Sequence, residues 1–270
     1  MNDQMAGLLA DRPVPARAGA ASRVIAIIDD PESGIGDLVN AVGADPALAA
    51  KLLTLANSAY YGLSRRVGTL QYAISVVGYQ TVRALTVPIC VGLDDPDAVP
   101  PGFWEQAASA ATAGHLIAPV LGASPPDAFC AGLLHTLGAA LLHQQSPLPA
   151  LCLPLVADEQ EFHRREIEQY GVGHAEAGAQ ALATWRFPEH LIYLIATHHD
   201  VPLPDAPPRT RALEGARLLA DLCLGGGRDR TRNISSLLRL SEGELTEARV
   251  DTIVEKVRMQ SEALLTGLRA

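Results

Sequence analysis

The sequence predicts an all-α protein, and three observations lead to this fold class. Apolar residues recur at intervals of three and four along nearly the whole chain, as one buried face of a helix requires. No long stretch alternates apolar with polar residues, which is the pattern that strands favour. Aromatic residues make up only 4% of the 270 residues, so the core must consist mainly of Ala, Leu and Val. Of these, Ala and Leu enter helices at the lowest cost in free energy.

Residues with known capping preferences delimit the helices expected in the N-terminal half. Asp45 can cap a helix that Pro46 opens, because Asp accepts hydrogen bonds from free N–H groups and Pro fits the first turn. Thr69 caps the next helix and Gly78 stops it, while Pro88 is expected to kink the third. The helices expected here span residues 46–57, 70–77 and 80–93.

The helices expected downstream are longer. One of them starts at Ser124-Pro125-Pro126 and is predicted to run through His135 without a break. Another, residues 159–170, is charged on most sides and is expected to lie at the surface. The downstream helices are predicted at residues 104–121, 125–144, 159–170, 175–185, 189–199 and 213–224, with one or two more within 242–268.

A segment rich in acids and prolines, residues 94–101, is the best candidate for a boundary between two lobes. The domain organisation predicted from the sequence is a flexible lead-in over residues 1–22, an N-terminal helical lobe over residues 23–98, and a second helical lobe with closing helices over residues 99–270.

Composition excludes several classes of function. Hydrophobic residues make up 48% and charged residues 19%, which is typical of a globular protein. The net charge of -9 argues against sequence-independent nucleic-acid binding, where neutralised phosphates dominate the affinity. No apolar run approaches the roughly 20 residues that span a bilayer, so no membrane association is expected. The four cysteines form no CxxC pair and are expected to be buried thiols in a reducing, cytoplasmic environment.

Several separated motifs resemble one family. Residues 45–48 (DPAL) and 55–62 (LANSAYYG) are similar to the N-terminal lobe of the HDOD domain, the HD-related output domain of bacterial signalling proteins. Its second lobe is similar to residues 131–135 (AGLLH), 173–178 (GHAEAG), 185–188 (WRFP) and 195–199 (IATHH). The resemblance covers residues 24–223 and implies a two-lobed helical HDOD fold with a non-catalytic, regulatory role. Because the motifs occupy nearly the whole chain, the output is expected to reach another polypeptide.

The same resemblance connects five histidines to the metal ligands of catalytic HD and HD-GYP phosphohydrolases. By position they match the first ligand, the dyad histidine, the next ligand and a final pair; they are His115, His135, His174, His198 and His199. Three features of those enzymes are missing. Thr136 stands at the position of the dyad Asp, Ala139 at that of the HD-GYP lysine, and residues 200–204 lack the Gly-Tyr-Pro element.

The lost acid bears directly on the chemistry. A carboxylate after His135 could bridge two cations and hold a hydroxide between them, whereas Thr136 carries no negative charge. Imidazoles alone bind zinc or nickel but retain magnesium or manganese poorly. The site is therefore expected to be vestigial, with no Mg²⁺ or Mn²⁺ cofactor. A transition metal on some of the histidines is an alternative, and histidines hydrogen-bonded within the core are the favoured interpretation of His115 and His135.

Two acids near this pattern have further interpretations. Glu176 could orient a ligand from behind, although its spacing of two from His174 turns the side chains apart on a helix and favours an exposed acid. Asp200 is the nearest carboxylate that could replace the missing dyad acid in an enzyme. His163, like His143 and His190, has no neighbour in the pattern and is expected at the surface.

A second set of residues, at the end of the helix over 46–57, could form a patch that binds a partner: Asn57, Ser58, Tyr60 and Tyr61. The alternative is structural, with Asn57 capping the helix and Tyr61 packed between lobes.

Taken together, these features predict a signalling adaptor that binds a partner protein without turnover. A link to a cyclic-dinucleotide second messenger is a variant of this hypothesis. The competing hypothesis is a metal-dependent phosphohydrolase with an altered site. A transcription regulator would need a basic recognition helix, which the acidic balance disfavours.

Overall fold

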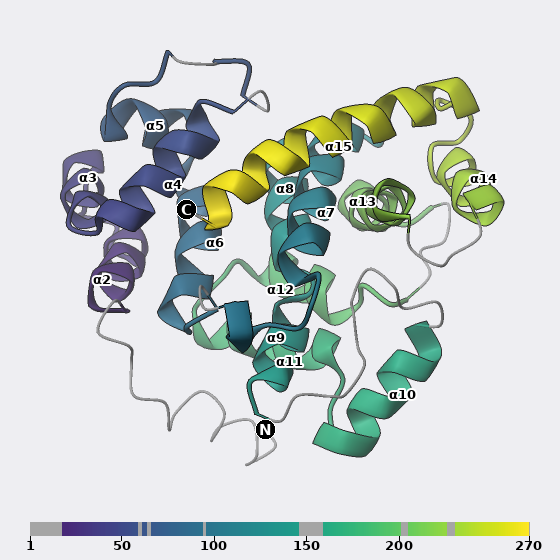
Figure 1. Ribbon diagram of the computed structural model, residues 1–270, viewed down its shortest axis with the longest axis horizontal. Helices are drawn as coiled ribbons and strands as arrows, with labels where there is room; N and C mark the ends of the chain where they lie inside the picture. Colours follow the sequence, from purple (N-terminus) through teal and green to yellow (C-terminus); the bar gives the residue numbers. More distant parts are fainter. Residues whose placement is uncertain are drawn as a thin grey trace. The chain divides into compact units, whose positions relative to one another are not determined.

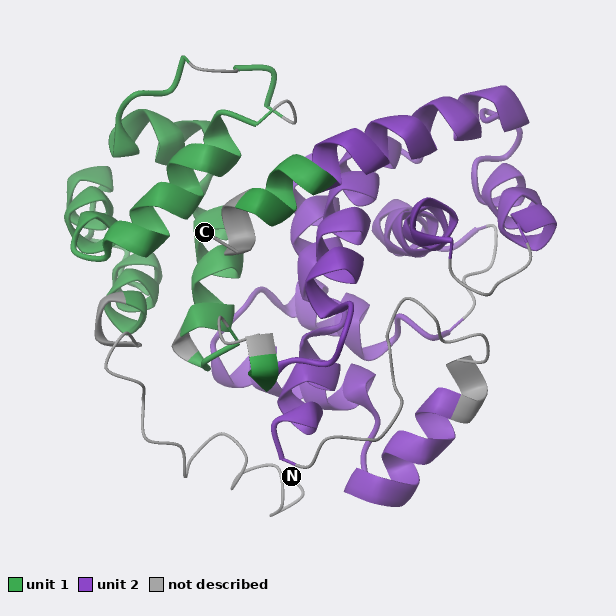
Figure 2. Cartoon of the chain, viewed as in Figure 1, with its two compact units in different colours: residues 1–98, 262–270 green, residues 99–261 purple. Residues whose placement is uncertain are grey.

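The computed structural model describes residues 18–58, 61–63, 66–93, 96–145, 159–200, 205–225 and 230–269. Helices make up most of these residues and no strand occurs among them, which confirms the all-α prediction (Figure 1). The chain divides into two compact units, residues 1–98 with 262–270 (unit 1) and residues 99–261 (unit 2) (Figure 2).

Unit 1 is built from short helices whose caps follow the sequence signals. The Asp45 side chain accepts hydrogen bonds from the N–H groups of Ala47 at 2.9 Å and Leu48 at 3.2 Å. The Thr69 hydroxyl accepts one from the N–H of Tyr72 at 3.2 Å. Its helices are α2 (Ala18–Asp29), α3 (Ile35–Gly43), α4 (Pro46–Ala56), α5 (Leu70–Val77) and α6 (Tyr79–Cys90), followed by the 3-10 turn η1 (Pro96–Ala98).

The N-terminal segment differs from its prediction. The helix α2 begins at Ala18, so residues 18–22 are not part of a flexible lead-in; residues 1–17 lie outside the described part of the chain. The helix packs against α6, and Asp29 at its end pairs with the buried Arg83 of α6 at 2.5 Å. Ala21 and Val24, three residues apart, are both fully buried on this helix, so its apolar face begins before residue 23.

The remaining helices belong to unit 2, apart from the end of the last one. They are α7 (Phe103–Ile117), α8 (Pro125–Leu134), α9 (Leu137–His143), α10 (Glu159–Tyr170), α11 (His174–Thr184), α12 (Glu189–Ala196), α13 (Pro208–Leu224), α14 (Arg230–Leu240) and α15 (Glu247–Arg269). The helix α14 was not expected from the sequence. The prediction also placed all residues after 99 in the second lobe, whereas the structure groups residues from Glu262 onward with unit 1.

The prediction of one continuous helix over residues 125–144 is wrong. The helix breaks at His135-Thr136, where Thr136 has φ -93 and ψ 3 and becomes the N-cap residue of α9. The N–H of Ala139 then donates to the Thr136 carbonyl at 3.0 Å and starts the new helix. Apolar periodicity continues across this turn because both helices are buried, so periodicity alone could not reveal the break.

The centre of unit 2 depends on close contact between helix backbones. The helix α7 packs on both α8 and α13, and its buried face is made largely of alanine. A Cβ added at Gly132 of α8 would clash with the carbonyl of Ala110, and one at Gly114 of α7 with the carbonyl of Ala128. Only glycine permits this approach at these two positions. The contact with α7 therefore determines where α8 lies, as far as its end at His135.

Within the described residues, none of the helices taken singly has both the length and the apolar character needed to cross a membrane. One sharply bent pair, α3 with α4, meets the criteria of length and composition when its two helices are joined.

Candidate functional site

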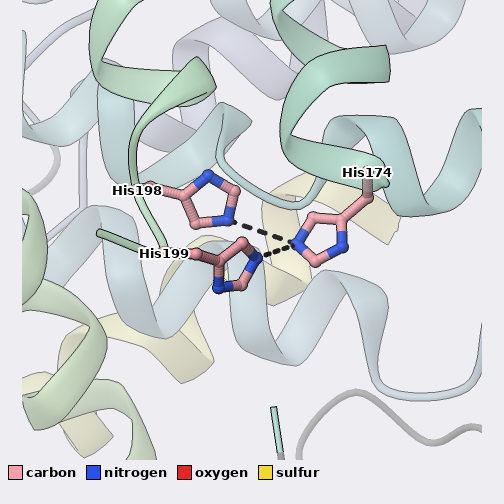
Figure 3. Close-up of side chains that lie close together, drawn as sticks. All are labelled: His174, His198 and His199. Carbon is pink, nitrogen blue, oxygen red and sulfur yellow. Dashed lines mark hydrogen bonds between the residues drawn. The ribbon is translucent and has the colours of Figure 1, made fainter. Parts of the chain in front are cut away.

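Three histidines of unit 2 meet at one point, which we call the histidine triad: His174, His198 and His199 (Figure 3). His174 is the first residue of α11, and the other two lie in the turn that follows α12. The Nε2 atom of His174 lies 3.2 Å from Nε2 of His198 and 2.8 Å from Nε2 of His199. One ligand atom from each ring falls within 4.8 Å of the others, a separation that a single metal ion can bridge.

The outer nitrogens of two of these rings are already committed. Nδ1 of His198 lies 2.6 Å from the carbonyl oxygen of Ile195, and Nδ1 of His174 lies 2.6 Å from Oε2 of Glu166. A carbonyl and a carboxylate only accept hydrogen bonds, so each Nδ1 carries the proton and donates it. In the neutral rings, both Nε2 atoms therefore point bare lone pairs at one another.

Two bare lone pairs 3.2 Å apart repel unless a proton or a cation lies between them. A proton on His198 or His199 is disfavoured because burial lowers the pKa of His198 well below 6.5 and that of His199 to about 2, and the neighbouring rings lower both further. The donor set fits a divalent transition metal such as zinc or nickel, which accepts neutral imidazole ligands. It does not fit magnesium, which prefers oxygen.

Glu166 is the carboxylate at this site, and sequence reasoning missed it. Although α10 was predicted to be a surface helix, the Glu166 side chain is only 3% exposed. Its Oε2 atom accepts hydrogen bonds from both Nδ1 and the backbone N–H of His174. Phe162, one helical turn earlier on the same face, was the available signal that this face of α10 is buried. Glu176 is exposed and accepts a hydrogen bond from Gln180 at 3.0 Å, so it does not orient His174.

His135 stands beside the triad. Its ring centroid lies 5.7 Å from that of His198, and its Nδ1 donates to the Gly132 carbonyl at 2.7 Å. Burial, followed by the charge of Arg217, lowers its pKa to about 3, so the ring is neutral. The core interpretation of this histidine therefore matches its surroundings. His115, near the end of α7, is partly buried and is not a member of the triad.

Thr136 is buried at 4% exposure, and its hydroxyl has no hydrogen-bond partner among the residues that the structure describes. An unpaired buried hydroxyl destabilises the folded state. Asp200, the other carboxylate considered from the sequence, is exposed.

Glycine contacts hold α9 against α11 and thereby set the position of His174. A Cβ at Gly138 would clash with the His174 carbonyl oxygen and would approach the Gly178 nitrogen. The helix that follows Thr136 thus touches the backbone of the first triad residue directly, which was not apparent from the spacing of the motifs.

The turn that carries His198 is held from α13. The buried Arg217 donates to the His198 carbonyl and, at 2.8 Å, to Glu214. Asp221, one turn later, has its pKa raised to about 6 because of burial, although the Arg217 charge and a hydrogen bond from Gln106 lower it. Arg217 therefore holds the turn through the His198 carbonyl without being a member of the triad.

The second patch considered from the sequence lies in unit 1. The Nδ2 group of Asn57 donates to the carbonyls of Leu53 at 3.0 Å and Val67 at 2.7 Å, and its Oδ1 accepts from the N–H of Val67 at 3.0 Å. Asn57 therefore caps α4 and ties residue 67 to the helix end, which agrees with the structural alternative. Ser58 is buried and Tyr61 is partly buried, while Tyr60 falls outside the described residues.

The fold and the site together define an all-α protein of two units with a cluster of three histidines in unit 2. The model of the HDOD domain matches residues 14–201, about two thirds of the sequence, and the chain belongs to this family.

Relatives and solved structures agree with this assignment. An uncharacterized protein of Treponema pallidum (strain Nichols) is 28% identical over 229 residues, covering 82% of this chain but only 44% of that protein. The chain thus spans less than half the length of this relative. An HDOD domain protein from Geobacter sulfurreducens superposes with a TM-score of 0.62 at 19% identity, with 97% of each chain covered. A provisionally named phosphohydrolase from Shewanella amazonensis SB2B gives a TM-score of 0.66 at 23% identity, with 100% and 98% covered. At these identities the two structures establish the fold alone.

Proposed function

We propose that this protein is a non-catalytic signal-transduction component that acts in the cytoplasm by binding another protein. The observation that carries the proposal is the state of the dyad position. Thr136 is neutral, buried and turned to no hydrogen-bond partner among the described residues. The carboxylate that does reach the site, Glu166, is used on the outer nitrogen of His174.

Hydrolysis of a phosphodiester in this superfamily would need anionic ligands that hold cations and lower the pKa of a bound water. The triad offers neutral imidazoles, and Asp200 is exposed. A cation here would have a stable set of nitrogen ligands without the bridging acid that positions a hydroxide. The site supports binding and structural roles better than turnover.

The names of similar structures support a regulatory role. The MmoQ response regulator from Methylococcus capsulatus str. Bath gives a TM-score of 0.50 at 20% identity, with 92% of this chain and 99% of that chain covered. A provisionally named signal transduction protein from Marinobacter aquaeolei VT8 gives a TM-score of 0.61 at 22% identity, with 99% and 64% covered.

Two measurements on the full chain test the proposal. First, protein loaded with Mn²⁺, Fe²⁺ or Zn²⁺ is assayed on cyclic di-GMP and on a generic phosphodiester, with His135→Ala as the control. We expect the wild type to match the variant, and turnover that His135→Ala abolishes would contradict the proposal. Second, crosslinking in the native host should capture a specific protein. That protein should then bind the purified chain at a defined stoichiometry.

The second candidate function is that of a metal-dependent phosphohydrolase with an altered site, in which the triad residues are the metal ligands. The short distances from Nε2 of His174 to Nε2 of His198 and of His199 favour it. Binding of cyclic di-GMP without hydrolysis, measured by calorimetry in the same preparations, would instead identify a nucleotide second messenger as the signal that the regulatory protein receives.

A further inference from the structure

The helix α10 presents one face to the histidine triad. The Phe162 ring packs edge-on against His174 with ring centroids 5.4 Å apart, and Glu166 accepts the Nδ1 proton of His174. The ring of His163 lies 5.8 Å from that of His199. Glu166 follows Phe162 by four residues and His163 by three, so it lies about one helical turn from each of them. Through these three contacts α10 forms one wall of the site.

His163 occupies an unusual position on this wall. Its side chain is 42% exposed, yet its Nδ1 atom is buried and makes no hydrogen bond with any described residue. Oε2 of Glu166 lies 4.0 Å from this atom, beyond hydrogen-bond distance. The ring packs directly on Gly173, where any Cβ would clash with it. The imidazole is thus partly exposed, with its ring beside that of His199 and its Nδ1 atom buried against Gly173.

A cation on the triad would still lack a ligand. Protein sites for zinc and similar ions are usually four-coordinate, and a site that is closed takes its fourth ligand from the protein. Two further imidazoles stand close enough to be considered, His135 and His163, with ring centroids 5.7 Å and 5.8 Å from the nearest triad ring.

The two candidates differ in their freedom to move. His135 is buried, sits at the junction of α8 and α9, and is fixed by its hydrogen bond to Gly132. His163 is partly exposed and belongs to a helix that packs only sparsely on the other described helices. A partly exposed side chain can change rotamer at little cost in free energy while Glu166 holds the helix in place. His163 can therefore turn toward a bound ion, whereas His135, which is not part of the 4.8 Å cluster of ligand atoms, would have to give up its bond to Gly132.

We propose that a divalent transition cation held by His174, His198 and His199 takes His163 as its fourth ligand, so that α10 closes over the ion. Glu166 adds a negative charge beside the cation and holds His174 in the orientation that the ion requires. Binding of the metal and docking of α10 become one event. The docking of α10 at the protein surface then depends on whether the site holds a metal ion.

Cobalt(II) tests the proposal, because its visible absorption reports the number and type of ligands whereas zinc gives no such signal. The chelator-stripped chain is titrated with Co²⁺ as wild type, His163→Ala, His135→Ala and the control His190→Ala, a histidine outside the triad. We expect tight binding and strong four-coordinate absorption in the wild type and in His190→Ala. His163→Ala should lose at least about tenfold in affinity, the lower end of the effect seen for groups that support metal ligands, and should show a weaker, shifted spectrum.

Amide hydrogen exchange provides a readout that is independent of the spectrum. Co²⁺ should slow exchange across residues 159–170 in the wild type and in His190→Ala but not in His163→Ala. Failure of the wild type to bind Co²⁺ would overturn the proposal, as would a His163→Ala variant with wild-type affinity and spectrum. A spectral change in His135→Ala that is absent from His163→Ala would assign the fourth position to His135 instead. All these measurements use the purified chain, so they are independent of whether it binds a protein partner.

Discussion

A single oxygen of Glu166 accepts two hydrogen bonds from His174, one from its backbone N–H at 3.0 Å and one from its ring Nδ1 at 2.6 Å. The first bond satisfies an unpaired donor at the start of α11, and the second fixes the ring tautomer. One carboxylate therefore anchors α10 to α11 and directs the Nε2 lone pair of His174 toward the other two histidines.

Neutralising this carboxylate should weaken metal binding. In Glu166→Gln, the amide oxygen can still accept hydrogen bonds but carries no charge, so the His174 ring is a weaker and less well oriented ligand. We expect the Kd for Zn²⁺ to rise by about 10- to 100-fold, measured by competition with a chromogenic chelator. Glu176→Gln, at an exposed site on α11, is the matched control and should leave the Kd unchanged. Equal affinities in the two variants would contradict the role assigned to Glu166.

The contact between α9 and α11 can be tested with one methyl group. Gly138→Ala places a Cβ against the His174 carbonyl, and the backbone cannot yield without moving the site. We expect the free energy of unfolding to fall by about 1–3 kcal/mol or more, measured by urea denaturation. Gly36→Ala, on an exposed helix position with no atom within 4 Å of the new Cβ, should instead raise it by up to about 1 kcal/mol. A Gly138→Ala variant as stable as Gly36→Ala would exclude this close packing.

Thr136 should tolerate a change to valine better than one to aspartate. Its buried hydroxyl has no partner among the described residues, so the nearly isosteric Thr136→Val should leave stability unchanged or raise it by about 1 kcal/mol. Thr136→Asp buries an unpaired charge and should destabilise the metal-free protein by about 3 kcal/mol.

Added Mn²⁺ should recover part of the stability of Thr136→Asp, because the new carboxylate supplies an oxygen ligand, and should leave Thr136→Val unaffected. Thermal unfolding with chelator and with Mn²⁺ measures both effects. A Thr136→Val variant that is strongly destabilised would mean that the hydroxyl has a partner.

Stability should fall as the pH drops below about 6.5, because His135 is neutral in the folded protein. Its folded pKa is lowered to about 3, whereas an unfolded histidine has a pKa near 6.5. Between these values the unfolded chain binds one more proton, so the free energy of unfolding decreases as pH falls, by about 1.4 kcal/mol per pH unit for this group. The contribution is fully present above pH 6.5.

His135→Gln removes this titrating group. In urea denaturation with chelator present, the variant should show a shallower pH dependence than the wild type between pH 6.5 and 5. Identical slopes in the two proteins would show that His135 does not remain neutral over this range.

Much of the fold could be predicted because its signals are local. The caps at Asp45 and Thr69 act within one helical turn, and both are present as expected. The family motifs likewise identified His174, His198 and His199. The break at His135-Thr136 could not be predicted in this way, because residues on both sides are apolar and buried. The same limitation hid Glu166, whose charge indicates exposure unless its partner is known.

The sequence by itself determined the helical class and the family, since both depend on residue type, order and short-range spacing. Only the tertiary structure decided which groups meet. It brought Glu166 and His163 of α10 to the triad, left Asp200 exposed and kept His115 outside the triad. The physical reason is that the meeting of α10, α11 and the turn after α12 depends on how helices pack across dozens of residues. Local preferences determine where each helix begins and ends. Backbone contacts, such as that of Gly138 with the His174 carbonyl, determine how the site residues lie relative to one another.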